Sequence, residues 1–382
     1  MKVVVAIDSL KDSLTSFEAG KAIEEGVRKA YGHLPVDIVV KPLADGGEGT
    51  VNALVEGLHG ELRQAEVHGP LDERVCCPYG YLRESRTAVI EMAGAAGLGL
   101  VPEKLRNPLN TTTYGVGEVI SQAMAQGVRN FIVGIGGSAT SDCGIGMLQA
   151  LGYIFSDADG HPVGLGGREA GRIAAIDDSQ VLPAIHECVF NIACDVTNPL
   201  FGRQGAAYIF GPQKGAVPEI VETLDKGSRS FAAVTAAYLG KDVSQTAGAG
   251  AAGGLGFAFL AYLNGNLRSG IQIVLDSIHL AEAIKDADYV VTGEGRLDAQ
   301  TAMGKAPIGV AKLAKQYKAK VIALAGCTTE DAIDCNRQGI DAFFSIVDTA
   351  MPLKEAMNKE NALRNMTNTA TQVFNLIRVA ET

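Results

Sequence analysis

Acidic residues follow directly after several apolar runs that have the composition of buried strands. The clearest examples are Asp8, Asp45, Glu48, Asp195, Glu294 and Asp298. In open α/β sheets, ligands bind outside the carboxyl ends of the strands, so these side chains are expected beside a ligand. Carboxylates in that position can hold a divalent ion or accept a proton from a hydroxyl group.

Glycine is concentrated in the same parts of the chain. There are 46 glycines in 382 residues, about 12%, where roughly 7% is ordinary. They cluster in the segments 46–49, 134–146, 248–256 and 293–304. Bare loop backbone can approach a phosphate closely and hold it with N–H groups. Together with the strand-end acids, these loops favour Mg²⁺-assisted phosphoryl transfer.

Standard nucleotide-binding motifs are only partly present. A Walker A loop is absent, because Gly304-Lys305 is not followed by Ser or Thr. Gly248–Gly253 fits the dinucleotide pattern, but no predicted strand precedes it. Gly134–Ala139 fits it after a predicted strand, and Asp157 lies about twenty residues further on. This second match supports an alternative function, a nicotinamide-dependent oxidoreductase of a small hydroxy acid.

Single polar residues also have ordinary structural explanations. Asp142 is interpreted as a helix cap, and Asp157 with Asp159 as part of a turn. Cys143 and Cys194 lack a partnering histidine and are interpreted as small packed residues. The six histidines fall in no catalytic spacing, so we expect all of them to be structural or at the surface.

Both ends of the chain alternate predicted strands and helices. The N-terminal part predicts strands at 3–7 and 36–40, separated by a helix that starts with the capping box Thr15–Glu18 and reaches about Ala30. The C-terminal part predicts strands at 289–292, 320–325 and 342–347 and helices at 305–317, 330–338 and 353–379. This alternation indicates βαβ units around a parallel sheet.

The middle of the chain has a different pattern. Glu61–Glu91 alternates polar and apolar residues, as antiparallel strands with one solvated face do, and Phe131–Ile135 and Val189–Ala193 are further apolar strands. We therefore predict a two-domain α/β fold. A discontinuous Rossmann-like domain with a parallel sheet would comprise residues 1–65 and 285–382, and a second α/β domain with a mixed sheet, residues 66–284, would be inserted in it.

Composition limits the partners. The formal net charge is −10 and there is no block of Lys or Arg, so nucleic acid and anionic membranes are poor partners. Val243–Leu267 is free of charges, but we expect a glycine loop running into a buried helix there, not a membrane span. Seven cysteines without a C-x-x-C pair, and a start without a signal segment, predict a cytoplasmic protein.

The motifs together resemble those of the type 1 glycerate kinase family, over essentially the whole chain and in the family's order. The matching segments are Asp8–Thr15, Ala44–Thr50, Gly134–Gly146, Cys194–Leu200, Gly211–Gly215, Gly248–Gly254, Thr292–Thr301 and Gly304–Pro307. The first segment departs from the family's usual pattern, which has Pro, Phe and Gly where this chain has Ile7, Leu10 and Asp12.

The resemblance implies two α/β domains with the active site in the cleft between them. It also implies ATP as the phosphoryl donor, Mg²⁺ as cofactor and D-glycerate as the acceptor, with 2-phosphoglycerate as the product. The oligomeric state is left open.

The matching segments then divide into roles. The residues expected to bind the acceptor carboxylate or the transferring phosphate are Asp8, Ser9, Lys11 and Arg296. Asp45 is the first candidate for the base that accepts the 2-hydroxyl proton and Asp195 the second, and the acid not so used would join Glu294 and Asp298 in holding Mg²⁺. The residues expected at the nucleotide phosphates are Gly136, Gly137, Ser138, Gln213, Lys214, Gly250, Gly253 and Gly254.

Overall fold

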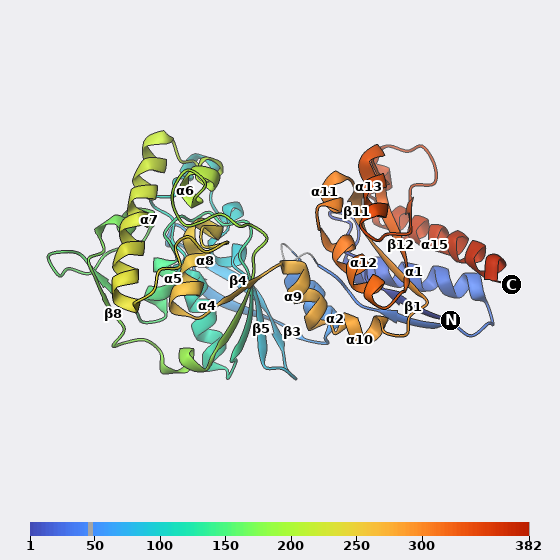
Figure 1. Ribbon diagram of the computed structural model, residues 1–382, viewed down its shortest axis with the longest axis horizontal. Helices are drawn as coiled ribbons and strands as arrows, with labels where there is room; N and C mark the ends of the chain where they lie inside the picture. The colour runs from blue at the N-terminus through green and yellow to red at the C-terminus, as the bar shows by residue number, and fades with distance from the viewer. Residues whose placement is uncertain (45–48, 382) are drawn as a thin grey trace. The chain divides into compact units, whose positions relative to one another are not determined.

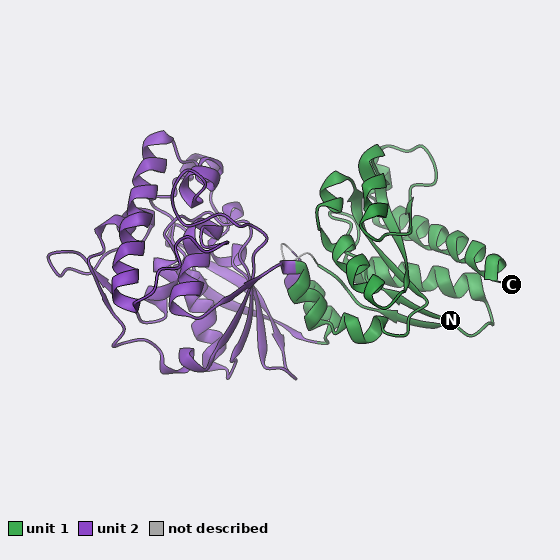
Figure 2. Cartoon of the chain, in the orientation of Figure 1, with its two compact units in different colours: residues 1–45, 52–59, 271–382 green, residues 46–51, 60–270 purple. Residues whose placement is uncertain are grey.

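A computed structural model describes residues 1–44 and 49–381 of the chain. It divides into two units, drawn in green and purple in Figure 2. Unit 1 comprises residues 1–45, 52–59 and 271–382, and unit 2 comprises residues 46–51 and 60–270. Each unit has its own sheet and its own hydrophobic core, so each is described by itself.

Unit 1 is built on a parallel sheet that both ends of the chain supply. The strand order is β13-β12-β11-β1-β2, and all neighbours run parallel. The strands are β1 (Lys2–Val5), β2 (Asp37–Val40), β11 (Tyr289–Leu297), β12 (Lys320–Thr328) and β13 (Ala342–Ser345). The central strands are continuous apolar runs because helices cover both faces of such a sheet. The predicted Rossmann-like parallel sheet is confirmed.

Helix α1 (Ser16–Tyr31) begins where the capping box predicts. Thr15 Oγ1 accepts from the N–H of Glu18, and the Glu18 carboxylate accepts from the N–H of Thr15. α1 packs along α15 (Lys359–Glu381), as Figure 1 shows in blue and red. A Cβ on Gly26 would lie only 2.6 Å from Ala370 Cβ, so glycine allows this close approach. Two further helices, α2 (Thr50–Gly57) and α9 (Gly270–Ser277), begin in unit 2 and continue in this unit. The remaining helices of this unit are α10 (Leu280–Ile284), α11 (Ala299–Ala302), α12 (Ala306–Gln316), η6 (Glu330–Ile333), α13 (Asp334–Arg337) and α14 (Leu353–Ala356).

Unit 2 contains the predicted mixed sheet. Its strand order is β10-β9-β6-β5-β4-β3, in which β10, β9, β6 and β5 run parallel and β4 and β3 continue antiparallel. The strands are β3 (Glu61–His68), β4 (Arg74–Leu82), β5 (Thr87–Glu91), β6 (Asn130–Gly134), β9 (Val189–Ala193) and β10 (Asn266–Arg268). A separate two-stranded sheet pairs β7 (Ile154–Ser156) with β8 (Ala175–Asp177).

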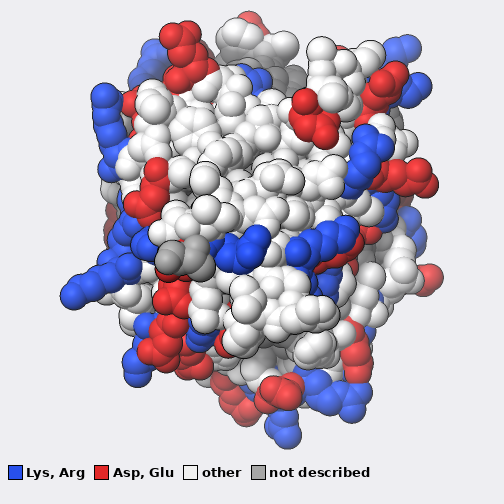
Figure 3. Space-filling model, turned by 90° about the vertical axis from the view of Figure 1, so that its right-hand side faces the viewer, with Lys and Arg blue, Asp and Glu red and all other residues white. Residues whose placement is uncertain are grey.

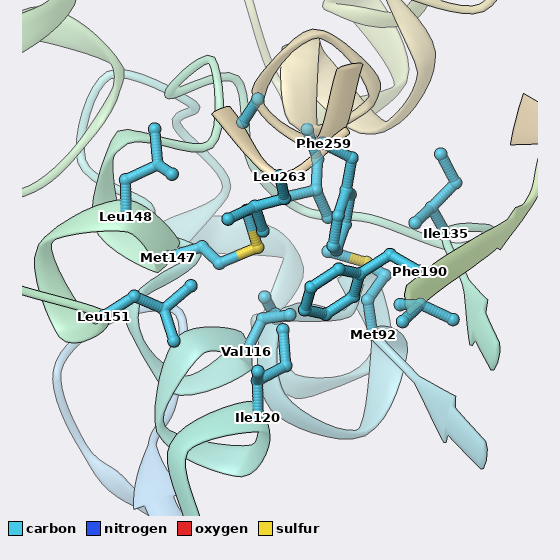
Figure 4. Close-up of a cluster of buried hydrophobic side chains, with 14 of the residues drawn as sticks. Met92, Val116, Ile120, Ile135, Met147, Leu148, Leu151, Phe190, Phe259 and Leu263 are labelled. Carbon is cyan, nitrogen blue, oxygen red and sulfur yellow. The ribbon is translucent and has the colours of Figure 1, made fainter. Parts of the chain in front are cut away.

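The helices of unit 2 cover this sheet and share its core. They are α3 (Ala93–Ala96), η1 (Leu98–Leu100), η2 (Glu103–Leu105), α4 (Tyr114–Ala125), α5 (Ile145–Ala150), η3 (Gly167–Arg172), η4 (Pro183–Glu187), α6 (Ala206–Phe210), η5 (Pro212–Lys214), α7 (Pro218–Leu239) and α8 (Ala251–Tyr262). In Figure 4, side chains from strands and helices converge, with Phe190 of β9 beside Val116 of α4 and Phe259 of α8. Each buried aromatic side chain of this kind removes a large apolar area from water.

The uncharged segment 243–267 is a glycine loop followed by the buried helix α8, as expected. No described helix combines the length and the hydrophobicity that crossing a bilayer would require. In the view of Figure 3, basic and acidic side chains are interspersed around an area without charge. Surface ion pairs include Lys21–Glu24 and Arg28–Glu24 on α1, and exposed pairs of this type contribute little to stability.

Candidate active site

The topology of unit 1 identifies one end of its sheet as a ligand site. From β1 the chain passes through α1 to β2 on one side, whereas β11 lies on the other side of β1 and leads to β12 and β13. The strand order therefore reverses between β1 and β11. In open α/β sheets the ligand binds at the carboxyl ends of the strands where this reversal occurs. The residues after β1 and at the end of β11 are those that the sequence predicts to bind the acceptor.

The loop after β1 is held tightly against the end of β11. The N–H of Asp8 donates to the carbonyl of Gly293 at 3.0 Å, and the Asp8 carboxylate accepts from the N–H of Ser9 at 2.6 Å. A Cβ on Gly295 would lie 3.6 Å from Leu10 Cα and 3.7 Å from the backbone nitrogen of Lys11. The loop after β1 and the end of β11 are therefore in contact. Asp8 is buried, Ser9 half-buried, and the Lys11 side chain exposed.

Asp12 has a left-handed backbone conformation, with φ of 61°. It lies in a tight loop in which the N–H of Leu10 donates to the carbonyl of Leu14. Glycine adopts this conformation without steric cost, and Asp tolerates it better than most residues do. This left-handed backbone conformation explains why the family that the sequence resembles has glycine at this position. The departure at Asp12 adds both a charge and a strained conformation beside Lys11.

A hydrogen-bond network joins the predicted residues at the end of β11. Arg296 Nε lies 3.3 Å from the carboxylate of Asp298, and the Arg296 side chain is 62% exposed. Asp298 caps α11 by accepting from the N–H groups of Gln300 and Thr301. Thr301 Oγ1 in turn donates to Glu294 at 2.6 Å. The carboxylates of Glu294 and Asp298 are thus held near each other by one buried threonine, which sequence reasoning did not single out.

The loop after β6 in unit 2 has open backbone. Gly136 and Gly137 are exposed, and a Cβ on Gly136 would meet no atom within 4 Å. Within the described part of the chain, the N–H groups of these two glycines have no hydrogen-bond partner. Gly137 has a φ of 71°, which favours glycine. The backbone of this segment is therefore open at the position where the sequence predicts the nucleotide phosphates.

The second predicted phosphate loop has a different environment. Gly250, Gly253 and Gly254 are buried against the chain itself. A Cβ on Gly250 would lie 2.2 Å from the carbonyl oxygen of Pro199, and one on Gly253 would lie 2.0 Å from the carbonyl oxygen of Thr140. The Gly253 carbonyl also accepts from the backbone of the loop after β6. These glycines are therefore accounted for by the packing of two loops against each other.

Lys214 is enclosed, whereas its neighbour Gln213 is exposed. The Lys214 ammonium donates to Ser138 Oγ at 2.8 Å and to the carbonyl of Thr140 at 2.5 Å. Burial lowers the pKa of Lys214 to about 7, and the nearby charge of Asp142 opposes this shift. Lys214 therefore contacts the loop after β6 from inside the unit.

Asp142 is a structural residue, in agreement with its interpretation as a cap. Its carboxylate accepts from the N–H and hydroxyl of Thr113, both at 2.8 Å, and from the N–H groups of Gly144 and Gly146 at the start of α5. Burial raises its pKa, and these hydrogen bonds counteract the shift. Cys143 beside it is buried, and burial raises the pKa of its thiol to about 12.

Strand ends elsewhere in unit 2 carry two further carboxylates. Asp195 follows β9, is exposed, and accepts from the N–H of Gly270 at the start of α9. Glu91 ends β5 and accepts from the N–H of Val51 at 2.9 Å. Sequence reasoning missed Glu91, although an acid directly after a buried strand was the signal that identified the others. Asp45, the first candidate for the base, lies outside the described residues.

Metal-ligating groups gather at one place among the described residues. Asp157, Asp159 and His161 have ligand atoms within 4.8 Å of one another in an exposed turn. The predicted Mg²⁺ ligands are divided, with Asp195 in unit 2 and Glu294 and Asp298 in unit 1. Their carboxylate oxygens fit the ion by donor chemistry, because Mg²⁺ takes oxygen ligands.

The structure does not match the dinucleotide-binding alternative. In that motif the acidic residue ends the strand next to the glycine loop's strand. Here Asp157 follows β7, which belongs to the separate sheet with β8. Its carboxylate accepts from the backbone of Asp159 and His161 and pairs with Arg172 at 3.0 Å. These hydrogen bonds, led by that from His161, lower the pKa of Asp157. Asp157 is thus a turn residue, as its alternative interpretation states.

Comparison with known proteins identifies the family. Residues 3–378 match the glycerate kinase family. The glycerate kinase of Haemophilus influenzae is 48% identical, with 99% of both chains covered, and the glycerate 2-kinase of Escherichia coli K12 is 48% identical, with 93% of both covered. A crystal structure assigned as glycerate kinase 2 from Salmonella typhimurium LT2 is 46% identical, covers 100% of this chain and 99% of that one, and has a TM-score of 0.92. This chain belongs to the glycerate kinase family.

Proposed function

We propose that this protein transfers the γ-phosphoryl group of ATP to the 2-hydroxyl of D-glycerate, giving 2-phosphoglycerate. The observation that carries the proposal is the contact of the Asp8–Leu14 loop with the end of β11 at the reversal of strand order in unit 1. Family membership supplies the substrate, and the name of the Escherichia coli relative supports the 2-position.

The two exposed cations of this region would bind the acceptor. Lys11 lies in the loop after β1 and Arg296 lies at the end of β11 that this loop contacts, and the planar fork of Arg296 suits a carboxylate or a phosphoryl group. The glycerate 2-oxygen forms a bond to the γ-phosphorus while the bond from phosphorus to the bridging oxygen of ADP breaks. The hydroxyl proton passes to a carboxylate, for which Asp45 is the first candidate and Asp195 the second.

Mg²⁺ would be held by Glu294 and Asp298 together with the acid that does not act as base. When bound, the ion supplies charge neutralisation to the phosphoryl oxygens. The exposed N–H groups of Gly136 and Gly137 would bind the nucleotide phosphates by donating hydrogen bonds.

Incubation with ATP, MgCl₂ and D-glycerate tests the proposal, with ³¹P and ¹³C NMR identifying the phosphorylated carbon. We expect ADP and 2-phosphoglycerate in equal amounts. L-glycerate and glycerol serve as control acceptors, the second because it lacks the carboxylate. Release of ADP without consumption of glycerate would refute D-glycerate as the acceptor. A 3-phosphate product would refute phosphorylation at the 2-hydroxyl. NADH titration, followed by its fluorescence, checks the alternative, and we expect no enhancement.

A further inference from the structure

One lysine of unit 2 is buried where lysine side chains are ordinarily exposed. Lys214 ends the 3₁₀ helix η5 and is 1% exposed. Its ammonium donates to Ser138 Oγ at 2.8 Å and to the carbonyl of Thr140 at 2.5 Å. Both acceptors belong to the loop after β6. Burying an ammonium is unfavourable unless it is hydrogen-bonded, so these two bonds hold the loop and the lysine together.

The chemistry of the two groups determines the direction of the bond to Ser138. Lys214 Nζ donates to Ser138 Oγ and to the carbonyl of Thr140, and two N–H donors are enough for both bonds whether or not the amine carries its extra proton, so Ser138 Oγ accepts from Lys214. The hydroxyl proton of Ser138 is therefore not used in this contact and can be donated to another group. Ser138 is 8% exposed and directly follows the open glycines Gly136 and Gly137. Lys214, which lies inside the unit, thus orients the Ser138 hydroxyl, and this hydroxyl follows directly after the unpaired N–H groups of Gly136 and Gly137.

We propose that residues 136–138 form an oxyanion-binding loop in which Lys214 is a positioning residue. The Ser138 hydroxyl and the N–H groups of Gly136 and Gly137 donate to the same oxyanion, and Lys214 keeps the hydroxyl in the donating orientation. The oxyanion is a phosphoryl group of ATP, so the inference rests on the proposed kinase function. Lys214 acts through Ser138, since its own ammonium is enclosed by protein.

The same loop has a second buried hydrogen bond to another part of the chain, and this bond provides a matched control. Thr111 is 1% exposed, and its Oγ1 donates to the carbonyl of Ala139 at 2.9 Å. This bond holds the loop but does not involve the Ser138 hydroxyl. Thr111→Val therefore removes a structural contact and leaves the proposed donor in place. A purely structural role of Lys214 predicts the same behaviour for Lys214→Met and Thr111→Val.

The experiment is a double-mutant cycle on the dissociation constant for ATP, measured on the full chain by titration calorimetry. We expect Ser138→Ala and Lys214→Met each to weaken ATP binding about 10-fold, the loss of a hydrogen bond to a charged group. We expect the double variant to bind ATP within threefold of Lys214→Met, because the two residues act as one donor. Thr111→Val is expected to lower the thermal midpoint and to change ATP binding less than twofold.

A double variant that shows the product of the two single effects would overturn the positioning role, as would Thr111→Val weakening ATP binding as much as Lys214→Met. Unchanged ATP and glycerate binding in Ser138→Ala would overturn the oxyanion loop. Weakened binding confined to D-glycerate would overturn the assignment of the oxyanion to ATP.

If Lys214→Met does not fold, Ser138→Thr replaces it, because it keeps the hydroxyl and is expected to retain ATP binding within threefold. A Ser138→Thr protein that binds ATP as weakly as Ser138→Ala contradicts the proposal. Binding of ATP by the wild type without phosphorylation of glycerate would refute the proposed function alone. Turnover in Ser138→Ala with normal ATP binding would refute this inference alone.

Discussion

Lys214→Met should change the way in which stability depends on pH. Burial lowers the pKa of Lys214 to about 7 in the folded protein, against a usual value of 10.5. Between these two pH values the unfolded chain carries a proton on this lysine that the folded chain lacks. Raising the pH across that window therefore favours the folded state, and below pH 7 the contribution is constant because both states are protonated.

The size of the effect follows from the two pKa values. One proton bound only by the unfolded chain gives a slope of about 1.4 kcal/mol per pH unit in the free energy of unfolding. From pH 7.5 to pH 9.0, wild type should gain about 2 kcal/mol relative to Lys214→Met. The lost hydrogen bonds to Ser138 and Thr140 shift the two curves apart by a constant amount, so they do not affect the slope.

Urea denaturation followed by far-UV circular dichroism measures this difference, with both proteins examined at each half pH unit. The unfolding of unit 2 is identified by Phe231→Ala, which removes a fully buried ring from that unit's core and shifts its transition. Parallel curves for wild type and Lys214→Met between pH 7.5 and 9.0 would refute the reasoning. A wild type that loses stability relative to the variant would show that folding favours the charged lysine.

Other substitutions test the backbone and the acceptor site. Asp12→Gly should raise the free energy of unfolding by about 1 kcal/mol, because it relieves a left-handed conformation; urea denaturation measures it. Gly253→Ala should lower stability by about 3 kcal/mol or more, since its Cβ would lie 2.0 Å from a carbonyl oxygen, whereas Gly136→Ala should change it by less than about 0.5 kcal/mol. Lys11→Ala and Arg296→Ala should each lower kcat about 1,000-fold in the coupled kinase assay.

A different result would contradict each of these predictions. A less stable Asp12→Gly protein would mean that the Asp12 side chain contributes more than its backbone conformation costs. Equal stability of the two glycine variants would contradict the packing of the two loops. Turnover within a few-fold of wild type for Lys11→Ala or Arg296→Ala would remove that residue from the acceptor site.

Local patterns in the sequence were sufficient for much of the fold. The apolar run at 3–7 predicts a strand buried on both faces, and the capping box at Thr15 predicts the start of α1 to within a residue. The alternation in Glu61–Glu91 predicts the antiparallel part of the second sheet. These features depend on residues that are close together in the sequence, so residue type and spacing are enough to predict them.

The candidate site was less predictable because its contacts join distant segments. A glycine can be required by a ligand or by the chain's own backbone, and only the structure distinguishes open Gly136 from Gly253, which packs on Thr140. The burial of Lys214 results from the packing of η5 against a loop that lies far away in the sequence. Asp157 likewise had the spacing of a ribose-binding acid, but its strand belongs to another sheet.

The division of unit 1 between the two ends of the chain has a consequence for biosynthesis. Val3 of β1 pairs with Tyr289 of β11, and α1 packs on α15, whose residues are translated after those of unit 2. Unit 2, apart from a short segment, is continuous from 60 to 270 and is therefore synthesised before β11. Domains generally fold as units during synthesis. The inserted unit is therefore expected to fold first, and β1 and α1 can pack only after β11 and α15 have been made. A C-terminal truncation that removes α15 therefore removes the helix on which α1 packs.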